Sequence, residues 1–144
     1  MESKIATSIE QSQLLSDSGL SPDTADMYYH WDTIGNAVGM KLETRPLDYS
    51  LPNDSIPAWT TDRLIALLPP TIETSGTTYA LTIRKFQSGI DGSPQFEVAY
   101  EDTRPSDYPV IFRIKTHESL MVSCVEMLGD ILKEKNNETN GTSD

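Results

Sequence analysis

Two neighbouring segments of the chain alternate between apolar and polar residues, and this pattern constrains the fold more than any other feature. The segments are TYALTIRKF (78–86) and QFEVAYED (95–102). Their apolar members are aromatic or aliphatic residues: Tyr79, Leu81, Ile83, Phe96, Val98 and Tyr100. A period of two in such residues predicts strands that bury one face and leave the other in water. The glycines and proline of QSGIDGSP between them predict a hairpin loop.

A third strand is predicted in YPVIFRIK (108–115), where Val110, Phe112 and Ile114 fall on one side. The turn residues of DTRPSD lead into it. The three segments therefore predict a three-stranded antiparallel meander. Its apolar face requires a cover, and the flanking segments have helical patterns that suit this role.

The strongest helical pattern is THESLMVSCVEMLGDILKEK, with Thr116 as the expected N-cap and an apolar stripe about 160° wide. A shorter helix is predicted in IPAWTTDRLIALLPP (56–70). Thr60 is its expected N-cap, and Pro69 and Pro70 end it. Because two turns are unstable alone in water, this helix must dock on another element, and we expect it to cover the apolar face of the sheet together with the long helix.

Near the N-terminus, Ser8 and Gln11 have the spacing of a capping box, and Gly19 is placed to end the first helix. Ser21, Pro22 and Asp23 carry helix-start signals and predict a second short helix that ends near residue 29. Residues 32–55 read as an irregular loop, in which 40–45 is a candidate fourth strand. Residues 135–144 are polar and predict a disordered tail. The prediction is therefore a single α+β domain over residues 1–134.

These blocks resemble a family of small bacterial proteins that are often encoded among phage-related and mobile-element genes. The family's middle block reads proline, a short residue, tryptophan, serine or threonine, then a leucine-rich segment ending in proline. Pro57, Ala58, Trp59 and Thr60 followed by LIALLP fit that block, and SPDTADMYY, FEVAY and the closing helical segment also match. Gly129 and Asp130 depart from the family, which commonly has an aromatic pair there. The resemblance implies one α+β domain of bacterial or phage origin and implies no activity.

The net charge of −11 argues against two classes of partner. Nucleic-acid phosphates and anionic membranes both attract a basic face, so neither is expected to bind this chain. The charge is concentrated outside the predicted sheet: residues 56–115 hold seven acids and six bases. A protein partner, basic or otherwise, is compatible with this balance. With no signal peptide and no apolar run near ~18 residues, we expect a cytoplasmic protein that is a monomer or a weak homo-oligomer.

Known catalytic patterns are not found in the sequence. Cys124 lies within the apolar helical stripe, and His30 and His117 have no second ligand at metal spacing. Glu97 and Glu101 share a strand face but lie about 13 Å apart, beyond the separation that glycosidases use. Neither a phosphate loop nor a GxSxG elbow is present. We therefore expect a non-enzymatic protein without metal or cofactor.

Two functions remain open. The first is a small accessory or protein-interaction module of a phage or mobile element. The second is an acidic decoy that mimics DNA and occupies a host DNA-binding protein, although its acids are scattered over the flanks and not in rows. If a partner surface exists, we expect it beside the loop 32–55, where an exposed aromatic patch would form from Tyr28, Trp31, Tyr49 and Trp59.

Overall fold

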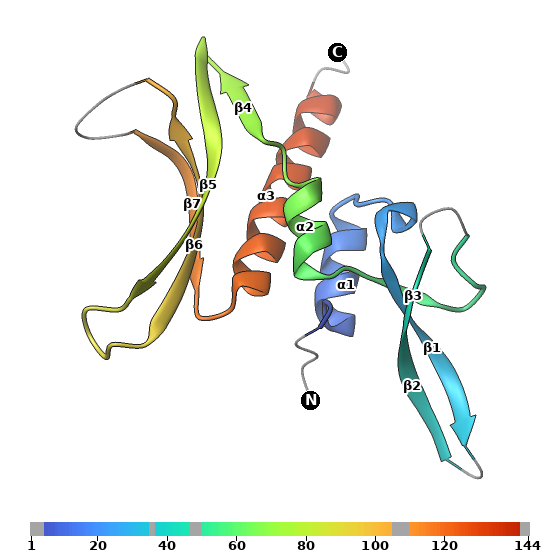
Figure 1. Cartoon of the computed structure of the whole chain (residues 1–144). Helices are drawn as coiled ribbons and strands as arrows, with labels where there is room; N and C mark the ends of the chain where they lie inside the picture. The colour runs from blue at the N-terminus through green and yellow to red at the C-terminus, as the bar shows by residue number, and fades with distance from the viewer. Residues whose placement is uncertain (1–4, 35–36, 47–49, 105–109, 142–144) are drawn as a thin grey trace.

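The computed structural model describes residues 5–34, 37–46, 50–104 and 110–141. Helices and two antiparallel sheets make an α+β fold (Figure 1). One sheet has four strands in the order β4-β5-β6-β7, and the other has three in the order β2-β1-β3. Among the described residues, no helix is both long and apolar enough to cross a membrane.

The four-stranded sheet is the predicted meander with one addition. Its strands are β4 (Thr71–Thr74), β5 (Thr77–Gln87), β6 (Pro94–Asp102) and β7 (Ile111–His117). β4 was not predicted, because its four residues TIET are too few to show a period. The middle of β6 bows toward α3 (Leu120–Gly141), and its two ends curve away from that helix (Figure 1).

The main core lies between this sheet and the helices. α3 packs on β6 and β7, as predicted. α2 (Thr61–Leu67) packs mainly on α3, whereas the sheet was its predicted partner. The core's largest fully buried side chains come from several elements: Leu15, Trp59, Leu64, Val98, Tyr100, Cys124 and Met127. The predicted apolar side of β6 therefore faces the helices.

The predicted helix signals at three positions are confirmed. Ser8 accepts a hydrogen bond from the Gln11 backbone N–H, and the Gln11 side chain completes the capping box of α1 (Ile9–Asp17). Gly19 follows with a φ of 107°, a backbone region that favours glycine. Thr60 caps α2, since its hydroxyl accepts from the Arg63 backbone N–H at 3.1 Å.

The second predicted helix is wrong. Ser21 does accept from the Asp23 backbone N–H, but the helical segment is only a 3₁₀ turn, Pro22–Thr24. The chain then enters β1 (Met27–Ile34), which pairs with β2 (Ala37–Thr44) and with β3 (Ile56–Ala58). Aromatic and branched residues in MYYHWDTI favour a strand, and pairing on both edges outweighs the local helix start. The loop 32–55 is thus replaced in large part by a hairpin, and residues 40–45 fall mainly within β2.

The third predicted strand and the long helix differ in detail from the prediction. A bulge opposite Glu101 breaks the alternation in β7, so Phe112 stacks on Tyr79 at 5.0 Å whereas Ile114 lies opposite Ala99. Thr116 belongs to β7 and is not the N-cap of α3. Ser119 takes that position, because its hydroxyl accepts from the Val122 backbone N–H at 3.4 Å.

The predicted disordered tail is also wrong for the residues that are described. α3 continues to Gly141, and residues 142–144 lie outside the described part. Within this extension the Asn136 amide donates to the Ser18 carbonyl oxygen at 2.9 Å. That bond ties the last turns of α3 to the end of α1, which the polar composition alone did not indicate.

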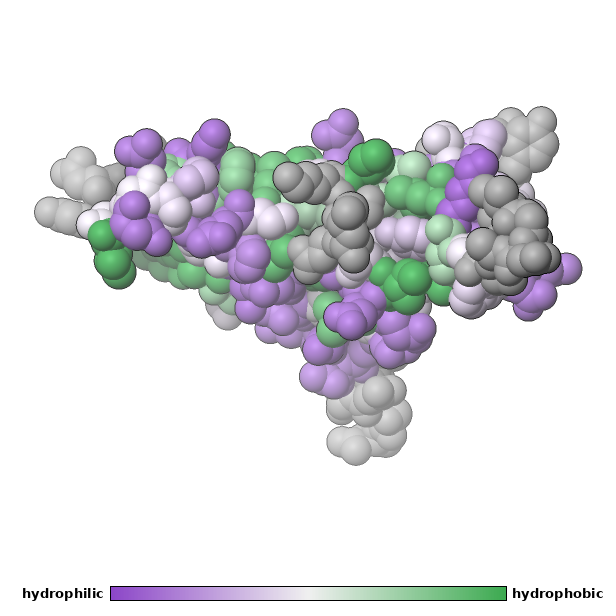
Figure 2. Space-filling view, turned by 90° about the horizontal axis from the view of Figure 1, so that it is seen from below, coloured by the Kyte–Doolittle hydropathy of each residue, from purple (hydrophilic) through white to green (hydrophobic). Residues whose placement is uncertain are grey.

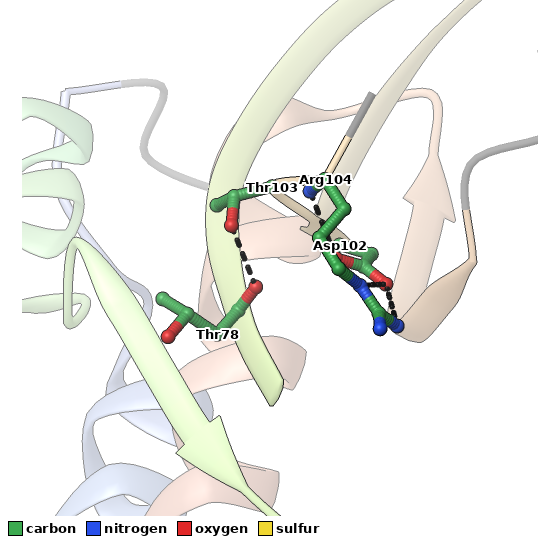
Figure 3. A network of polar contacts seen from close by, with 4 residues as sticks. All are labelled: Thr78, Asp102, Thr103 and Arg104. Carbon is green, nitrogen blue, oxygen red and sulfur yellow. Dashed lines mark hydrogen bonds and ion pairs between the residues drawn. The ribbon is translucent and has the colours of Figure 1, made fainter. Parts of the chain in front are cut away.

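The end of β6 is fixed by a compact group of polar contacts (Figure 3). The Arg104 guanidinium folds back onto the Asp102 carboxylate, with a shortest N–O distance of 2.6 Å. Thr103 donates from both its backbone N–H and its hydroxyl to the Thr78 carbonyl oxygen on β5. The arginine lowers the pKa of Asp102 from its ordinary value by donating hydrogen bonds to the ionised carboxylate.

Candidate functional site

The β1–β2 hairpin projects from the rest of the molecule, away from the four-stranded sheet (Figure 1). Only its base pairs with β3, through Met27, Tyr28 and Tyr29. Beyond this base, its outer half is a two-stranded ribbon. Successive residues of a strand place their side chains on opposite faces. The register places Tyr29 and Trp31 on one face and Tyr28 and His30 on the other.

The first face runs from buried to exposed along the hairpin. At the base, Tyr29 is buried with Ala6 and Ala58, and its hydroxyl donates to the Thr7 carbonyl oxygen at 2.7 Å. Leu42, opposite Tyr29, packs half-buried against this small cluster. Trp31, two residues after Tyr29 along β1, is 64% exposed. An indole that the protein leaves in water is uncommon enough to suggest a contact surface.

The second face is polar and aromatic. The rings of Tyr28 and His30 lie 5.7 Å apart. Glu43 on β2 lies 3.5 Å from the His30 imidazole and 3.2 Å from the Lys41 ammonium. Hydrogen bonds from Lys41 and then from His30 lower the pKa of Glu43 from its ordinary value. The carboxylate is therefore ionised at neutral pH.

A hollow of about 390 Å³ lies between β1 and the turn that precedes β3. Its lining residues come from these two segments: Tyr28, His30, Trp31, Pro52, Asn53 and Asp54. Asp54 has a φ of 60°, a left-handed conformation that Asp and Asn adopt more readily than other side chains. The Ser55 hydroxyl donates to the Pro52 carbonyl oxygen at 2.6 Å and closes the turn. Aromatic residues of β1 and the acidic residue of this turn thus line one hollow.

The predicted aromatic patch is only partly present. Tyr28 and Trp31 line the hollow, whereas Trp59 is fully buried in the main core and cannot belong to an exposed patch. Trp59 is buried because its indole N–H donates to the Thr24 hydroxyl at 3.0 Å while the ring fills the core. Tyr49 lies outside the described residues. Asp54 was missed, although the Asn53-Asp54 pair is a recognisable turn signal.

The remaining sequence candidates for chemistry lie elsewhere. Cys124 is buried in α3, and burial raises the pKa of its thiol to about 11. Arg84 brings the carboxylates of Glu97 and Glu101 to one guanidinium, at 3.5 and 2.7 Å. His117 is exposed, and its ring accepts a hydrogen bond from the Ser119 backbone N–H. In the described part of the chain, no group of three metal-ligating side chains comes together.

Exposed apolar side chains occur in several parts of the molecule besides the hairpin. In Figure 2, hydrophobic side chains reach the surface in several places among hydrophilic ones. The exposed large apolar residues include Trp31 in β1, and Ile83, Phe86, Ile111, Phe112 and Ile114 in the four-stranded sheet. Others, such as Ile9 and Leu14, lie in α1. Comparison of the chain with protein-family models, curated proteins and solved structures gives no match.

Proposed function

We propose that the chain is a non-catalytic protein-interaction module whose contact surface is the outer half of the β1–β2 hairpin. The observation that carries the proposal is the 64% exposure of Trp31 beside the hollow. Tryptophan is among the side chains that contribute most to binding energy at protein interfaces. Met40 lies directly opposite Trp31 on β2, so the two side chains lie on the same face of the hairpin. An accessory role in a phage or mobile element fits the family that the sequence resembles.

The lining of the hollow supports a partner that presents a basic side chain. A lysine or arginine in the hollow would lie beside the aromatic residues of β1 that line it, and aromatic rings attract cations. Asp54 would supply the counter-charge from the opposite wall. The net charge of −11 would also steer a basic partner toward this chain over long distances.

Ion pairing within the chain favours this function over a DNA-mimicking decoy. A decoy needs free carboxylates in rows, but Glu97 and Glu101 share Arg84, and Asp102 is paired with Arg104. On α3, Asp130 pairs with Lys115 at 2.7 Å. These pairs neutralise part of the acidic surface. The carboxylates that remain free are therefore spaced less regularly than the phosphates of a DNA backbone.

The test is a capture experiment with three tagged forms of the full chain: native, Trp31→Ala and Ile90→Ala. Ile90 is a matched control because it is 98% exposed on the β5–β6 loop, away from the hairpin. Proteins retained from the native host are identified by mass spectrometry. We expect a species that the native chain and Ile90→Ala retain and that Trp31→Ala loses. Equal retention by all three forms would contradict the proposal.

The same experiment at two salt concentrations separates the two functions. A tryptophan-anchored complex requires Trp31 at about 0.05 M NaCl and also at about 0.5 M, where salt weakens the charge attraction but not the apolar contact. A DNA mimic would lose its host protein over that range irrespective of Trp31.

A further inference from the structure

We propose that two copies of the chain associate through the open face of the four-stranded sheet, independently of the hairpin surface. The open face is the side of β5, β6 and β7 turned away from α3. The strand register defines its rows: Ala80 with Glu101 and Ile111, Thr82 with Ala99 and Ile114, Arg84 with Glu97 and Thr116, and Phe86 with Gln95. The alternate residues, such as Val98 and Tyr100, face the core.

The open face carries more apolar side chains than is usual for a sheet face that stays exposed to solvent. Phe86, Ile111 and Ile114 are each 43% exposed on it. The solvent face of an antiparallel sheet ordinarily carries polar residues, so branched and aromatic side chains there indicate a surface that becomes covered. Figure 1 shows no helix or strand of the described chain over this side of the sheet.

The curvature of the sheet explains how a second copy fits. β6 bows toward α3, so the open face is concave (Figure 1). Ala99 is fully buried on this face although no helix covers it, as expected for a central strand in a concave sheet. Two four-stranded half-barrels that meet by their open faces give eight strands. A barrel of eight strands has an interior that side chains can just fill.

Charge favours this face over the rest of the surface for self-association. Two chains of net charge −11 repel each other, but residues 56–115, which span β4, β5, β6 and most of β7, carry seven acids and six bases. On the face itself, Arg84 lies 3.5 Å from Glu97 and 2.7 Å from Glu101. Because these charges are already paired within one chain, covering them does not leave an isolated ion.

The area is adequate for a dimer. Four strands at ~4.8 Å spacing and ~8 residues at ~3.3 Å give on the order of 500 Å² of projected face per copy. Side chains that protrude from the sheet and the edge of β7 that pairs with no other described strand add to this contact area. A standard stable interface covers about 800 Å² per partner, so the open face can supply most of it.

The first experiment measures the mass of the full chain in solution by sedimentation velocity over a concentration series. We expect a concentration-dependent dimer of twice the 16.0 kDa chain mass. The dimer should persist in about 1 M NaCl, because an apolar interface is not screened and the flanking acids repel less in salt. A monomer at all concentrations, or a dimer that salt dissolves, would overturn the proposal.

The second experiment locates the interface. Ile114→Asp and Phe86→Asp should each convert the dimer to monomer, whereas Ile90→Asp, on the exposed loop beyond the sheet, should leave it intact. Near-ultraviolet circular dichroism checks that each variant is folded. If Ile114→Asp fails to fold, Phe86→Asp decides, because its side chain lies at the end of β5. A folded variant at either position that remains dimeric places the interface elsewhere and overturns the assignment.

Discussion

The two sheets of this molecule are both antiparallel, yet they are held in different ways. The four-stranded sheet rests on a continuous core in which Trp59, Leu64, Tyr100 and Met127 are fully buried. The three-stranded sheet has a small cluster of buried residues, Ala6, Tyr29 and Ala58, with partly buried neighbours at its base. The first sheet is therefore stabilised mainly by burial of apolar surface.

At the base of the hairpin, hydrogen bonds replace apolar burial as the main stabilising contacts. The buried Arg45 side chain donates to the carbonyl oxygens of Asp23 and Ala25, each at 2.8 Å. Its backbone N–H donates to the Asp26 carbonyl oxygen. These bonds fix the root of the hairpin, whereas Trp31, further along β1, is 64% exposed. The comparison shows that Trp31 is exposed at a position that contributes nothing to either core cluster. Such a position suits a contact surface.

The largest expected effect separates the two tryptophans. Trp59→Ala should lower the free energy of unfolding by about 3–5 kcal/mol, because it leaves a large cavity in the core. Trp31→Ala should change it by less than about 0.5 kcal/mol, because the ring is mostly in water. Urea denaturation of both variants measures the difference.

Fluorescence provides an independent check on the same pair. Acrylamide should quench the Trp31 emission readily and the Trp59 emission poorly, as read in the two single-tryptophan chains Trp59→Phe and Trp31→Phe. Similar quenching of both would show that the hairpin end is covered and that the contrast between the sheets is wrong.

The next effect tests whether the hairpin is a separate unit of stability. Arg45→Ala should cost about 2 kcal/mol, since hydrogen bonds from charged groups are worth about 1.5–3 kcal/mol. The loss should appear as faster amide hydrogen exchange in β1 and β2, with β5 and β6 unchanged. Lys41→Ala, in the exposed part of β2, is the control and should change neither. Uniform acceleration in both sheets would mean that the molecule opens as one unit.

The sequence predicted the body of the molecule because its signals are local and agree with one another. The alternation in β5 and β6, the cap at Thr60, the capping box at Ser8 and the apolar stripe of α3 each specify what the structure contains. Strand periodicity also placed Tyr100 correctly under the helices. In these segments local preference and long-range packing favour the same conformation.

The hairpin was missed because its determinants are not local. Ser21, Pro22 and Asp23 favour a helix start, and only pairing with β2 and β3 makes the following residues a strand. For the same reason Trp59 was assigned to a surface. Its place before the N-cap was read correctly, but its burial depends on Thr24 and on core residues distant in sequence. Of the four residues predicted for the aromatic patch, two therefore line the hollow, one lies in the core and one lies outside the described residues.

A smaller effect concerns the junction between the two sheets. Thr60→Ala should cost about 1 kcal/mol through the lost cap, and up to about 2 because the hydroxyl also donates to the Asp26 carboxylate at 2.5 Å. Thr61→Ala should cost little, because Thr61 is the first residue inside the helix. Chemical denaturation of the two variants decides. Equal midpoints would contradict the cap at Thr60.

The smallest expected effect lies at the end of β6, where an exposed ion pair is screened by water. The pKa of Asp102 is lowered in the folded chain, chiefly by hydrogen bonds from Arg104, so the ionised carboxylate stabilises the fold. That contribution is present at pH values above the ordinary Asp pKa of 3.8 and is lost as pH falls through the lowered value. Arg104→Ala should therefore lower the thermal midpoint slightly at pH 7, and the difference from the native chain should vanish in acid.

The control for this pair is Asp102→Asn, which removes the titrating group. In that background Arg104→Ala should produce no pH-dependent difference, because no carboxylate remains at position 102 to lose its charge. Thr103 still bonds to the Thr78 carbonyl oxygen in every variant, so the strand end itself stays in register. A pH-dependent effect of Arg104→Ala that survives in the Asp102→Asn background would assign the arginine to another acid. The end of β6 would then be stabilised by a charge other than that of Asp102, and the local pairing of Arg104 with Asp102 would not explain the effect.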